Sequence, residues 1–252
     1  MAASILITAA TPAEMHAITI YAENIRSSTV GWRELLSGAL HGQAVSLLIT
    51  GPGLSNTVQA ITATIETARP AMIINTGCAG VFKETGLKIG DIAVATQEID
   101  IQIGIEPAHG SVLTRLLPFP ILIKNGIEIK RRYFLNEELA DNAFTILTQA
   151  FANTDVNIAK GPFITVSTIT ATDLRAADIF SHYHPCMEAM EGAGAAHLAC
   201  FYDIPLIEVR SASNFVGKRD KNQWNLPLAF QRSAAAVKEC IRCVKEISSY
   251  RL

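Results

Sequence analysis

Short apolar runs alternate with stretches of helical periodicity along the chain, and this alternation limits the fold more than any other feature. It is typical of α/β layers, in which helices cover a sheet. The pattern predicts strands over residues 4–9, 33–40, 44–50, 71–75, 92–96 or as far as 103, 163–169 and 206–211. It predicts helices over residues 12–25, 55–67, 136–152, from Thr172 onward, 192–202 and 228–249.

The composition favours one domain, residues 1–252, that acts on a small molecule. Of the 252 residues, 49% are hydrophobic and 17% are charged, so the chain can bury a large core. The net charge is −2 and the cationic residues are scattered, which argues against binding of nucleic acid or an anionic membrane. No apolar run approaches the roughly 20 residues of a membrane helix, and residues 1–10 do not resemble a signal peptide. We therefore expect a cytoplasmic protein.

The five cysteines are expected to be reduced and mostly buried. Cys240 and Cys243 have a spacing that could serve zinc or redox chemistry, but no second pair and no nearby histidine accompanies them. Core thiols are the more common use of such residues. The histidines are dispersed and no Gly-x-Ser-x-Gly elbow is present, so we expect neither a metal site nor a serine triad.

One long segment, residues 104–132, is irregular and contains three prolines. Long irregular segments inside a compact domain are often functional. We expect a lid or a subunit contact here.

Two glycine-rich segments follow predicted strands. Gly51-Pro52-Gly53 could cradle an anion at a helix start, although a structural turn explains it equally well. The third glycine of a dinucleotide fingerprint is missing, so an oxidoreductase of that kind is disfavoured. Residues 75–80 (NTGCAG) predict a turn at the carboxyl end of a strand, with or without a ligand.

Three polar residues adjoin apolar segments and are expected to be partly buried, namely Glu14, Glu191 and Asn214. Buried carboxylates without partners are rare, so such positions suggest function. Each also has a simpler explanation when taken alone. Glu14 and Glu191 could stabilise helix starts, and Asn214 could cap a turn.

Taken in order, these motifs resemble the nucleoside phosphorylase and nucleosidase superfamily over almost the whole chain. The resemblance rests on Glu14, Gly51-x-Gly53, residues 75–80 followed by Ile89-Gly90-Asp91, Met190-Glu191, and residues 211–214 (SASN). Within the superfamily the chain is most similar to the methylthioadenosine nucleosidase branch, and within that branch to the futalosine hydrolases. The resemblance implies a three-layer α/β/α sandwich around a mixed sheet.

The resemblance also implies roles for individual residues in cleaving an N-glycosidic bond, with no cofactor and no metal. Glu14 would activate water, Glu191 would hold the ribose hydroxyls with Met190 against the sugar, and Asn214 would hold the leaving base. Base contacts are implied near Ile169 and Thr170. Cys78 stands where the branch commonly has serine, which puts a polar contact by that side chain in doubt.

Two departures from relatives indicate the type of substrate. Asn75 stands where phosphorylases carry a phosphate-binding arginine, so water is expected as the nucleophile. Asn214 stands where adenine-specific nucleosidases carry aspartate, and its amide suits a 6-oxopurine. This implies hydrolysis of futalosine with release of hypoxanthine, a step of menaquinone formation.

The carboxylate of futalosine would need a cation, and Arg115, Lys218 and Arg219 are candidates. The branch also implies a homodimer or a higher oligomer. The alternatives are another purine nucleosidase, a purine nucleoside phosphorylase, or a nucleoside-binding protein without activity.

Overall fold

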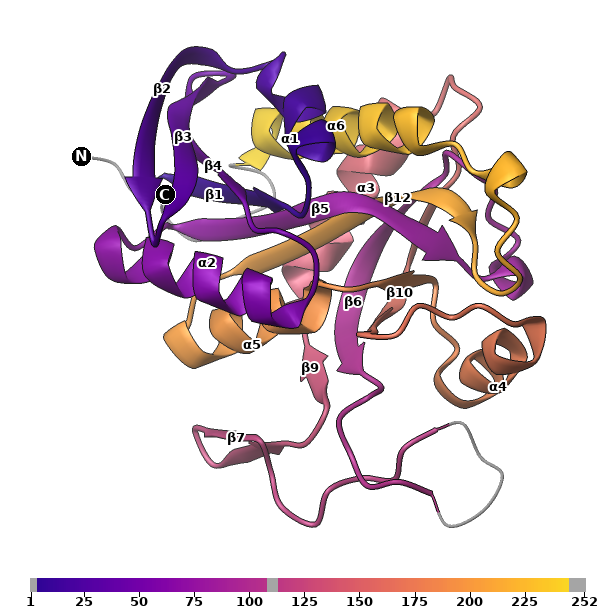
Figure 1. The fold of residues 1–252 in the computed structure, drawn as a ribbon. Coiled ribbons are helices and arrows are strands. Elements are labelled where there is room, and N and C mark those ends of the chain that lie inside the picture. Colours follow the sequence, from indigo (N-terminus) through magenta and orange to yellow (C-terminus); the bar gives the residue numbers. More distant parts are fainter. Residues whose placement is uncertain (1–3, 108–112, 245–252) are drawn as a thin grey trace.

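A computed structural model describes residues 4–107 and 113–244, which form a ten-stranded mixed sheet covered by helices (Figure 1). The strands lie in the order β11-β10-β6-β12-β5-β1-β4-β3-β2, and β9 pairs with β6. Their bounds are Ile5–Ala9 (β1), Glu23–Val30 (β2), Arg33–Leu40 (β3), Gln43–Ile49 (β4), Met72–Val81 (β5), Ile92–Asp100 (β6), Arg132–Phe134 (β9), Ile158–Thr165 (β10), Met187–Ala189 (β11) and Leu206–Phe215 (β12).

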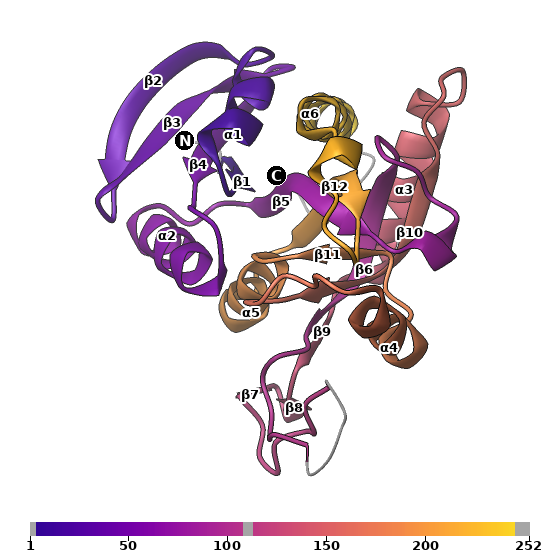
Figure 2. The ribbon, with the colours of Figure 1, turned by 45° about the vertical axis from the view of Figure 1, so that its right-hand side comes forward.

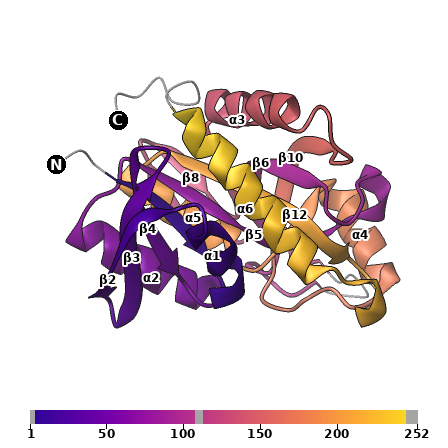
Figure 3. The same ribbon diagram turned by 90° about the horizontal axis from the view of Figure 1, so that it is seen from above.

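Helices cover both faces of this sheet, which confirms the predicted α/β/α sandwich. One apolar core joins the sheet to α1 (Pro12–Thr19), α3 (Glu137–Ala150) and α6 (Leu226–Arg242). A second core joins the opposite face to α2 (Leu54–Thr67) and α5 (Gly192–Tyr202). Seen from above, α6 crosses the sheet with α3 beside it (Figure 3). A further helix, α4 (Asp173–Tyr183), packs near β10 through a third group of apolar residues.

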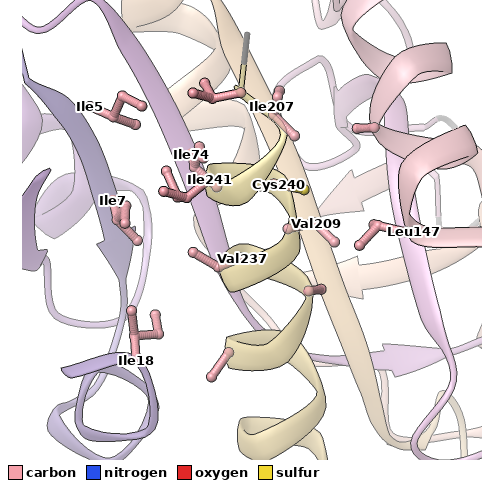
Figure 4. Close-up of a cluster of buried hydrophobic side chains, with 14 of the residues drawn as sticks. Ile5, Ile7, Ile18, Ile74, Leu147, Ile207, Val209, Val237, Cys240 and Ile241 are labelled. Atoms are coloured by element: carbon pink, nitrogen blue, oxygen red, sulfur yellow. The ribbon is translucent and has the colours of Figure 1, made fainter. Parts of the chain in front are cut away.

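Cys240 and Cys243, whose spacing could have served zinc or redox chemistry, belong to the apolar core beneath α6. Cys240 lies between Val237 and Ile241 on the helix face that meets β5 and β12 (Figure 4). Cys240 and Cys243 are both buried and unbridged, as predicted. Burial in this apolar environment raises the pKa of the Cys240 thiol to about 12, so it stays protonated at neutral pH.

Truncating a side chain in this core should lower stability without touching the polar residues singled out above. Ile241 is completely buried, and we expect Ile241→Ala to cost about 2–5 kcal/mol in the free energy of unfolding. Urea titration followed by circular dichroism measures the loss. Ile20→Ala removes the same atoms from a side chain that is 64% exposed and is the matched control. Equal losses in both variants would contradict this account of the core.

The sheet brings the carboxyl ends of several parallel strands to one edge. Strand β1 pairs in parallel with β4 and β5, and β5 pairs in parallel with β12. Figure 1 shows β5 and β12 ending side by side. The segments that follow β1 and β4 carry Glu14 and Gly51-x-Gly53, and Asn214 lies near the end of β12, so the topology collects them.

Five of the strands also form a closed ring. Strand β12 joins β5 to β6, β6 pairs with β10, β10 with β11, and β11 returns to β5 in antiparallel register. The sequence pattern could not predict this closure, because β11 has only three residues and so shows no strand periodicity.

Several predicted boundaries are wrong. The first helix ends at Thr19, not near residue 25, because residues 23–30 pair with β3 as an added edge strand. The predicted turn at 76–80 is strand, since β5 continues to Val81 along β12. The strand predicted at 163–169 is β10, which begins and ends earlier, and the strand predicted at 206–211 continues to Phe215. The predicted final helix begins two residues earlier, at Leu226, and residues 245–249 of that prediction lie outside the described part.

The irregular segment 104–132 carries some local structure. A bridge joins Ile105 to Arg115, and β7 (Leu122–Lys124) pairs with β8 (Ile127–Ile129). Figure 2 shows this hairpin standing away from the main sheet below β9. Residues 108–112 of the segment lie outside the described part, and its role as a lid or subunit contact stays a prediction.

The described residues contain neither a membrane-spanning helix nor a cluster of metal ligands. No helix among them combines the length and apolar character needed to cross a membrane. Likewise, in residues 4–107 and 113–244 no group of three histidine, cysteine or acidic side chains is placed to hold a metal ion.

Candidate active site

One cavity of about 210 Å³ collects the seven residues to which the resemblance gives catalytic or substrate-binding roles. It lies where β1, β5 and β12 end, between these strands and the segment that follows β10. Its lining includes Glu14, Cys78, Ile169, Thr170, Met190, Glu191 and Asn214. The structure thus brings together side chains that are far apart in the sequence.

Glu14 is held rigidly in the wall of this cavity. It is the third residue of α1 and forms a capping box with Thr11, whose backbone N–H and hydroxyl donate to Glu14 Oε2 at 2.9 and 2.8 Å. The Cys78 N–H donates to Oε1 at 2.9 Å. Glu14 therefore stabilises the start of a helix, which was the simpler of its two interpretations. It is also buried in the cavity wall with 3% exposure.

Gly77 permits this close approach of strand and carboxylate. A Cβ atom at position 77 would lie 2.5 Å from Glu14 Oε1, and the φ angle of Gly77 is +141°. Any side chain here would push Glu14 out of place. The glycine interpreted from the sequence as a turn signal thus serves packing inside a strand.

Glu191 links the glycine turn after β4 to the start of α5. Its Oε1 accepts from the Gly53 N–H at 3.0 Å, and its Oε2 accepts from the Met190 N–H at 3.2 Å. Gly53 is the N-cap of α2, so the carboxylate occupies the anion position at that helix start. The anion cradle predicted as one alternative for Gly51-x-Gly53 is thus filled by the protein itself.

Arg210 on β12 lies directly behind Glu191, and the sequence interpretation missed it. Its Nη2 lies 3.3 Å from Glu191 Oε2, and its Nε donates to Glu208 Oε1 at 2.7 Å. Its Nη1 donates to the Cys78 carbonyl at 3.2 Å. Arg210 is 1% exposed, so it acts on the cavity through the residues it holds.

Asn214 follows a small irregularity in β12, where the register with β5 shifts between Ala212 and Asn214. Its Oδ1 accepts from the Ser213 hydroxyl at 2.8 Å, and its Nδ2 donates to the Phe215 carbonyl at 3.0 Å. Together these two contacts use half of the four hydrogen-bonding positions of the amide. One N–H and one lone pair are left for a ligand.

Thr170 is fixed by Glu188, another residue that sequence reasoning missed. The Thr170 N–H and hydroxyl donate to the two oxygens of Glu188 at 3.0 and 2.5 Å. Burial raises the pKa of Glu188, and these hydrogen bonds partly oppose the shift. Thr170 is thus committed to Glu188, while Ile169 beside it is 43% exposed and lines the cavity.

Cys78 contributes mainly through its backbone. Its N–H binds Glu14 and its carbonyl binds Arg210, so the strand connects the two charged residues. Burial, with the nearby Glu14 carboxylate, raises the pKa of the Cys78 thiol to about 12. The thiol is neutral at pH 7 and is a weak donor.

Among the three cations considered for a substrate carboxylate, Arg219 lines the cavity. Its guanidinium lies 4.9 Å from the centre of the Trp224 ring, which also lines the cavity. Arg115 lines a different cavity beside Arg131 and Tyr183. Lys218 is not among the lining residues of either cavity.

Asn75 points away from the cavity into the sheet. Its Oδ1 accepts from the Thr8 hydroxyl at 2.9 Å, and its Nδ2 donates to Glu208 Oε1 at 3.0 Å. The residue is therefore part of the interior polar network and does not contact a ligand in the cavity.

Comparisons with known proteins identify the family of the chain. Residues 4–242 match the family model described as "Phosphorylase superfamily". The 5'-methylthioadenosine/S-adenosylhomocysteine nucleosidase of Psychromonas ingrahamii is 26% identical over 226 residues, covering 86% of this chain and 89% of the relative. The enzyme of that name from Anoxybacillus flavithermus is 28% identical over 197 residues, covering 77% and 78%.

Solved structures give the same fold. The nucleosidase of that name from Neisseria meningitidis, crystallised with methylthio-immucillin-A, superposes with a TM-score of 0.81 at 21% identity, covering 95% of this chain and 98% of the other. Since a single family model spans nearly all of the chain and the fold agrees, the protein belongs to the phosphorylase superfamily.

Proposed function

We propose that the protein is a nucleosidase that hydrolyses the N-glycosidic bond of a purine nucleoside. The observation that carries the proposal is the convergence of Glu14, Glu191 and Asn214 on one cavity. The relatives named as nucleosidases support the same activity. The single most direct test is release of free base from purified protein.

The three residues would divide the chemistry of this bond. Cleavage passes through a sugar with oxocarbenium character, as in glycoside hydrolysis. Glu14 would take the proton of the attacking water, and Glu191 would accept hydrogen bonds from the ribose hydroxyls and place negative charge near the sugar. Asn214 would hold the departing base, and Met190 would pack against the ribose.

Water fits this cavity better than phosphate as the nucleophile. The Gly53 N–H is taken by Glu191, and Arg210 is buried against two carboxylates. Asn75 is turned into the sheet. Among the described residues that line the cavity, Arg219 is the one cation, and its stacking on Trp224 places it beside that ring.

Two substrate classes compete for the base position. The names of the relatives favour 5'-methylthioadenosine and S-adenosylhomocysteine, and the comparisons support this assignment more directly than any other. Asn214 favours a 6-oxopurine, because its free N–H can donate to O6 and its free lone pair can accept from a protonated N7. An amide cannot donate a proton to adenine N7 as an acid.

Futalosine is the specific 6-oxopurine nucleoside that we propose. Its carboxylate would lie toward Arg219, and the apolar Trp224, Val216 and Leu226 would contact its aryl group. We further propose that the protein forms a homodimer in which segment 104–132 contacts the neighbour.

A substrate panel separates these assignments. The protein is incubated with futalosine, inosine, 5'-methylthioadenosine and S-adenosylhomocysteine, each with and without phosphate, and free bases are separated chromatographically. Hypoxanthine from futalosine supports the oxopurine assignment, and adenine as the main product supports the adenine assignment. A rate that requires phosphate would contradict the assignment of water, and no release from any nucleoside would contradict the nucleosidase proposal.

Asn214→Asp should shift the preference toward adenine nucleosides. The new carboxyl can donate to N7 and accept from the 6-amino group, whereas it meets O6 of an oxopurine with a second acceptor. We expect the ratio of kcat/KM for adenine over oxopurine nucleosides to rise about 100-fold or more, since sites built on such directional bonds discriminate strongly. Steady-state kinetics with both substrate types measures this ratio.

Asn136→Asp provides the matched control for this substitution. Asn136 caps α3 by accepting from the Leu139 N–H, which an aspartate also does, and it lies outside the cavity lining. The substrate preference of the Asn136→Asp variant should equal that of the natural protein. If Asn214→Asp leaves the ratio unchanged as well, Asn214 does not select the base.

A further inference from the structure

A line of four ionisable side chains runs from the cavity wall into the interior. Glu191 lies at the cavity, Arg210 lies behind it at 3.3 Å, and Glu208 lies behind Arg210 at 2.7 Å. Glu98 on β6 ends the line and is completely buried, as is Glu208. Burying several ionisable side chains together costs free energy, because each loses its hydration. Packing alone does not explain why they are arranged in a line.

The last two carboxyls meet at the start of α5. A Cβ atom on Gly192 would lie 2.0 Å from Glu98 Oε1 and 2.6 Å from Glu208 Oε2. Both oxygens therefore lie close to the same side of Gly192. Neither of these two oxygens has a hydrogen-bond partner outside the pair within the described residues. Two ionised carboxylates cannot share so small a dry space, and one of them must carry a proton.

The surroundings place this proton on Glu98. Glu208 Oε1 accepts from Arg210 Nε at 2.7 Å and from Asn75 Nδ2 at 3.0 Å, and a neighbouring guanidinium favours the ionised form. Glu98 Oε2 accepts from the neutral Thr165 hydroxyl at 2.7 Å. Burial, followed by the charge of Glu208, raises the pKa of Glu98 well above its usual range.

We propose that Glu208 is a positioning residue for glycosidic cleavage, held ionised by a protonated Glu98 so that its charge offsets that of Arg210. This inference rests on the proposed nucleosidase function. Arg210 fixes Glu191 and the Cys78 carbonyl, but its positive charge lies behind the place where the ribosyl cation forms. With Glu208 ionised, Glu191 keeps a net negative charge toward the sugar, and this charge matters most in the transition state.

The other titratable neighbours differ along the line: those of Glu98 are neutral, whereas Arg210 also faces the anionic Glu14. Glu98 faces Thr165 from β10, Glu208 and Arg210 from β12, and the start of α5. Its register partner on β9 is Tyr133, whose hydroxyl is engaged with His197 Nδ1 at 3.0 Å. Glu14 also favours the charged form of Arg210 from the far side.

The kinetic test compares Glu208→Gln with Glu98→Gln, two equally conservative changes. Glu208→Gln removes a negative charge and should lower kcat about 10- to 100-fold with KM nearly unchanged, because neutral ribose binds as before. Glu98→Gln replaces a protonated acid by a neutral amide that can accept from the Thr165 hydroxyl and donate to Glu208, and kcat should stay within about threefold. Equal losses in both variants, or no loss in Glu208→Gln, would overturn the proposal.

A double variant removes one source of compensation. In Glu208→Gln the neighbouring Glu98 can ionise and replace part of the missing charge from a greater distance. The variant Glu98→Gln with Glu208→Gln prevents this, so its kcat should be at least as low as that of Glu208→Gln alone. A double variant with the natural rate would contradict the offsetting of charge.

Ligand binding separates charge from structural damage. Calorimetry would compare a nucleoside analogue that has a cationic iminoribitol ring with the matched analogue that has a neutral ring. Glu208→Gln should weaken the cationic analogue about 10-fold or more and the neutral one little, whereas a distorted cavity would weaken both equally. Equal weakening would leave Glu208 a merely structural residue and overturn the proposal.

The proton on Glu98 has a test that needs no substrate. Because its folded pKa is raised, the protonated pair adds stability that is complete below the ordinary glutamate pKa and is lost as pH rises through the folded value. Glu98→Gln should lack this loss on the alkaline side, and the infrared carbonyl band of a buried acid should vanish with it. Identical pH profiles and spectra would show that Glu98 is ionised. This result stands even if no purine nucleoside proves to be a substrate.

Discussion

Glu14→Gln should abolish most turnover while the protein still folds. The amide has no basic lone pair of comparable strength, so the attacking water keeps its proton, and the loss of a general base lowers kcat about 10²- to 10⁴-fold. The cavity and the other polar residues stay in place, so KM should change little. Single-turnover kinetics with the best substrate of the panel measures the chemical step.

The hydrogen bonds of Glu14 also predict a moderate loss of stability. The Thr11 and Cys78 N–H groups both donate to this carboxylate, and an amide can accept from only one side. One N–H loses its acceptor, at a cost of about 1–3 kcal/mol. Glu138→Gln, an exposed first-turn residue of α3, is the control and should be unchanged in rate. A Glu14→Gln protein that keeps more than about a tenth of the natural kcat would remove Glu14 from the base role.

Glu191→Gln should slow the chemical step about 10²- to 10³-fold, as expected when one preorganised electrostatic group is lost. The substitution removes the negative charge beside the sugar and turns an amide NH₂ toward existing donors, either the Gly53 N–H or Arg210. The Arg210 charge then faces the cavity with less compensation. The expected signature is a fall in kcat that exceeds any rise in KM.

The control for this variant is Glu66→Gln on α2, an exposed residue bonded to the Tyr202 hydroxyl. It tests the same chemical change on the helix that begins next to Gly53. Thermal unfolding of both variants shows whether the loss of rate follows a loss of folded protein. An unchanged chemical step in folded Glu191→Gln would separate this carboxylate from the sugar.

Local signals made much of the fold predictable. The helix over 192–202 was predicted at its observed bounds, and Asn136 and Thr172 cap α3 and α4 at the predicted starts. Such signals depend on neighbouring residues, which the sequence displays directly. Strand β2 could not be predicted in this way, because its mostly exposed residues pair only with β3 at the sheet edge.

The cavity residues were predictable through their motifs, but the residues behind them were not. Glu14, Glu191 and Asn214 each follow an apolar segment, and their order along the chain carried the resemblance. Glu98, Glu208 and Arg210 lie inside strands and gain meaning only from contacts between strands. Charged residues in the middle of apolar strand patterns, as in residues 206–211 (LIEVRS), were the available signal.

The ring of β5, β12, β6, β10 and β11 has a mechanical consequence. Because the ladders form a cycle, a rotation at any one of them would strain the other four, so the frame that carries Cys78, Glu188 and Asn214 has no internal hinge. Any movement that admits a ligand to the cavity is therefore expected in segments outside the cycle. Residues 217–226 lie outside the cycle and bring Arg219 and Trp224 to the cavity lining, so we expect the movement there.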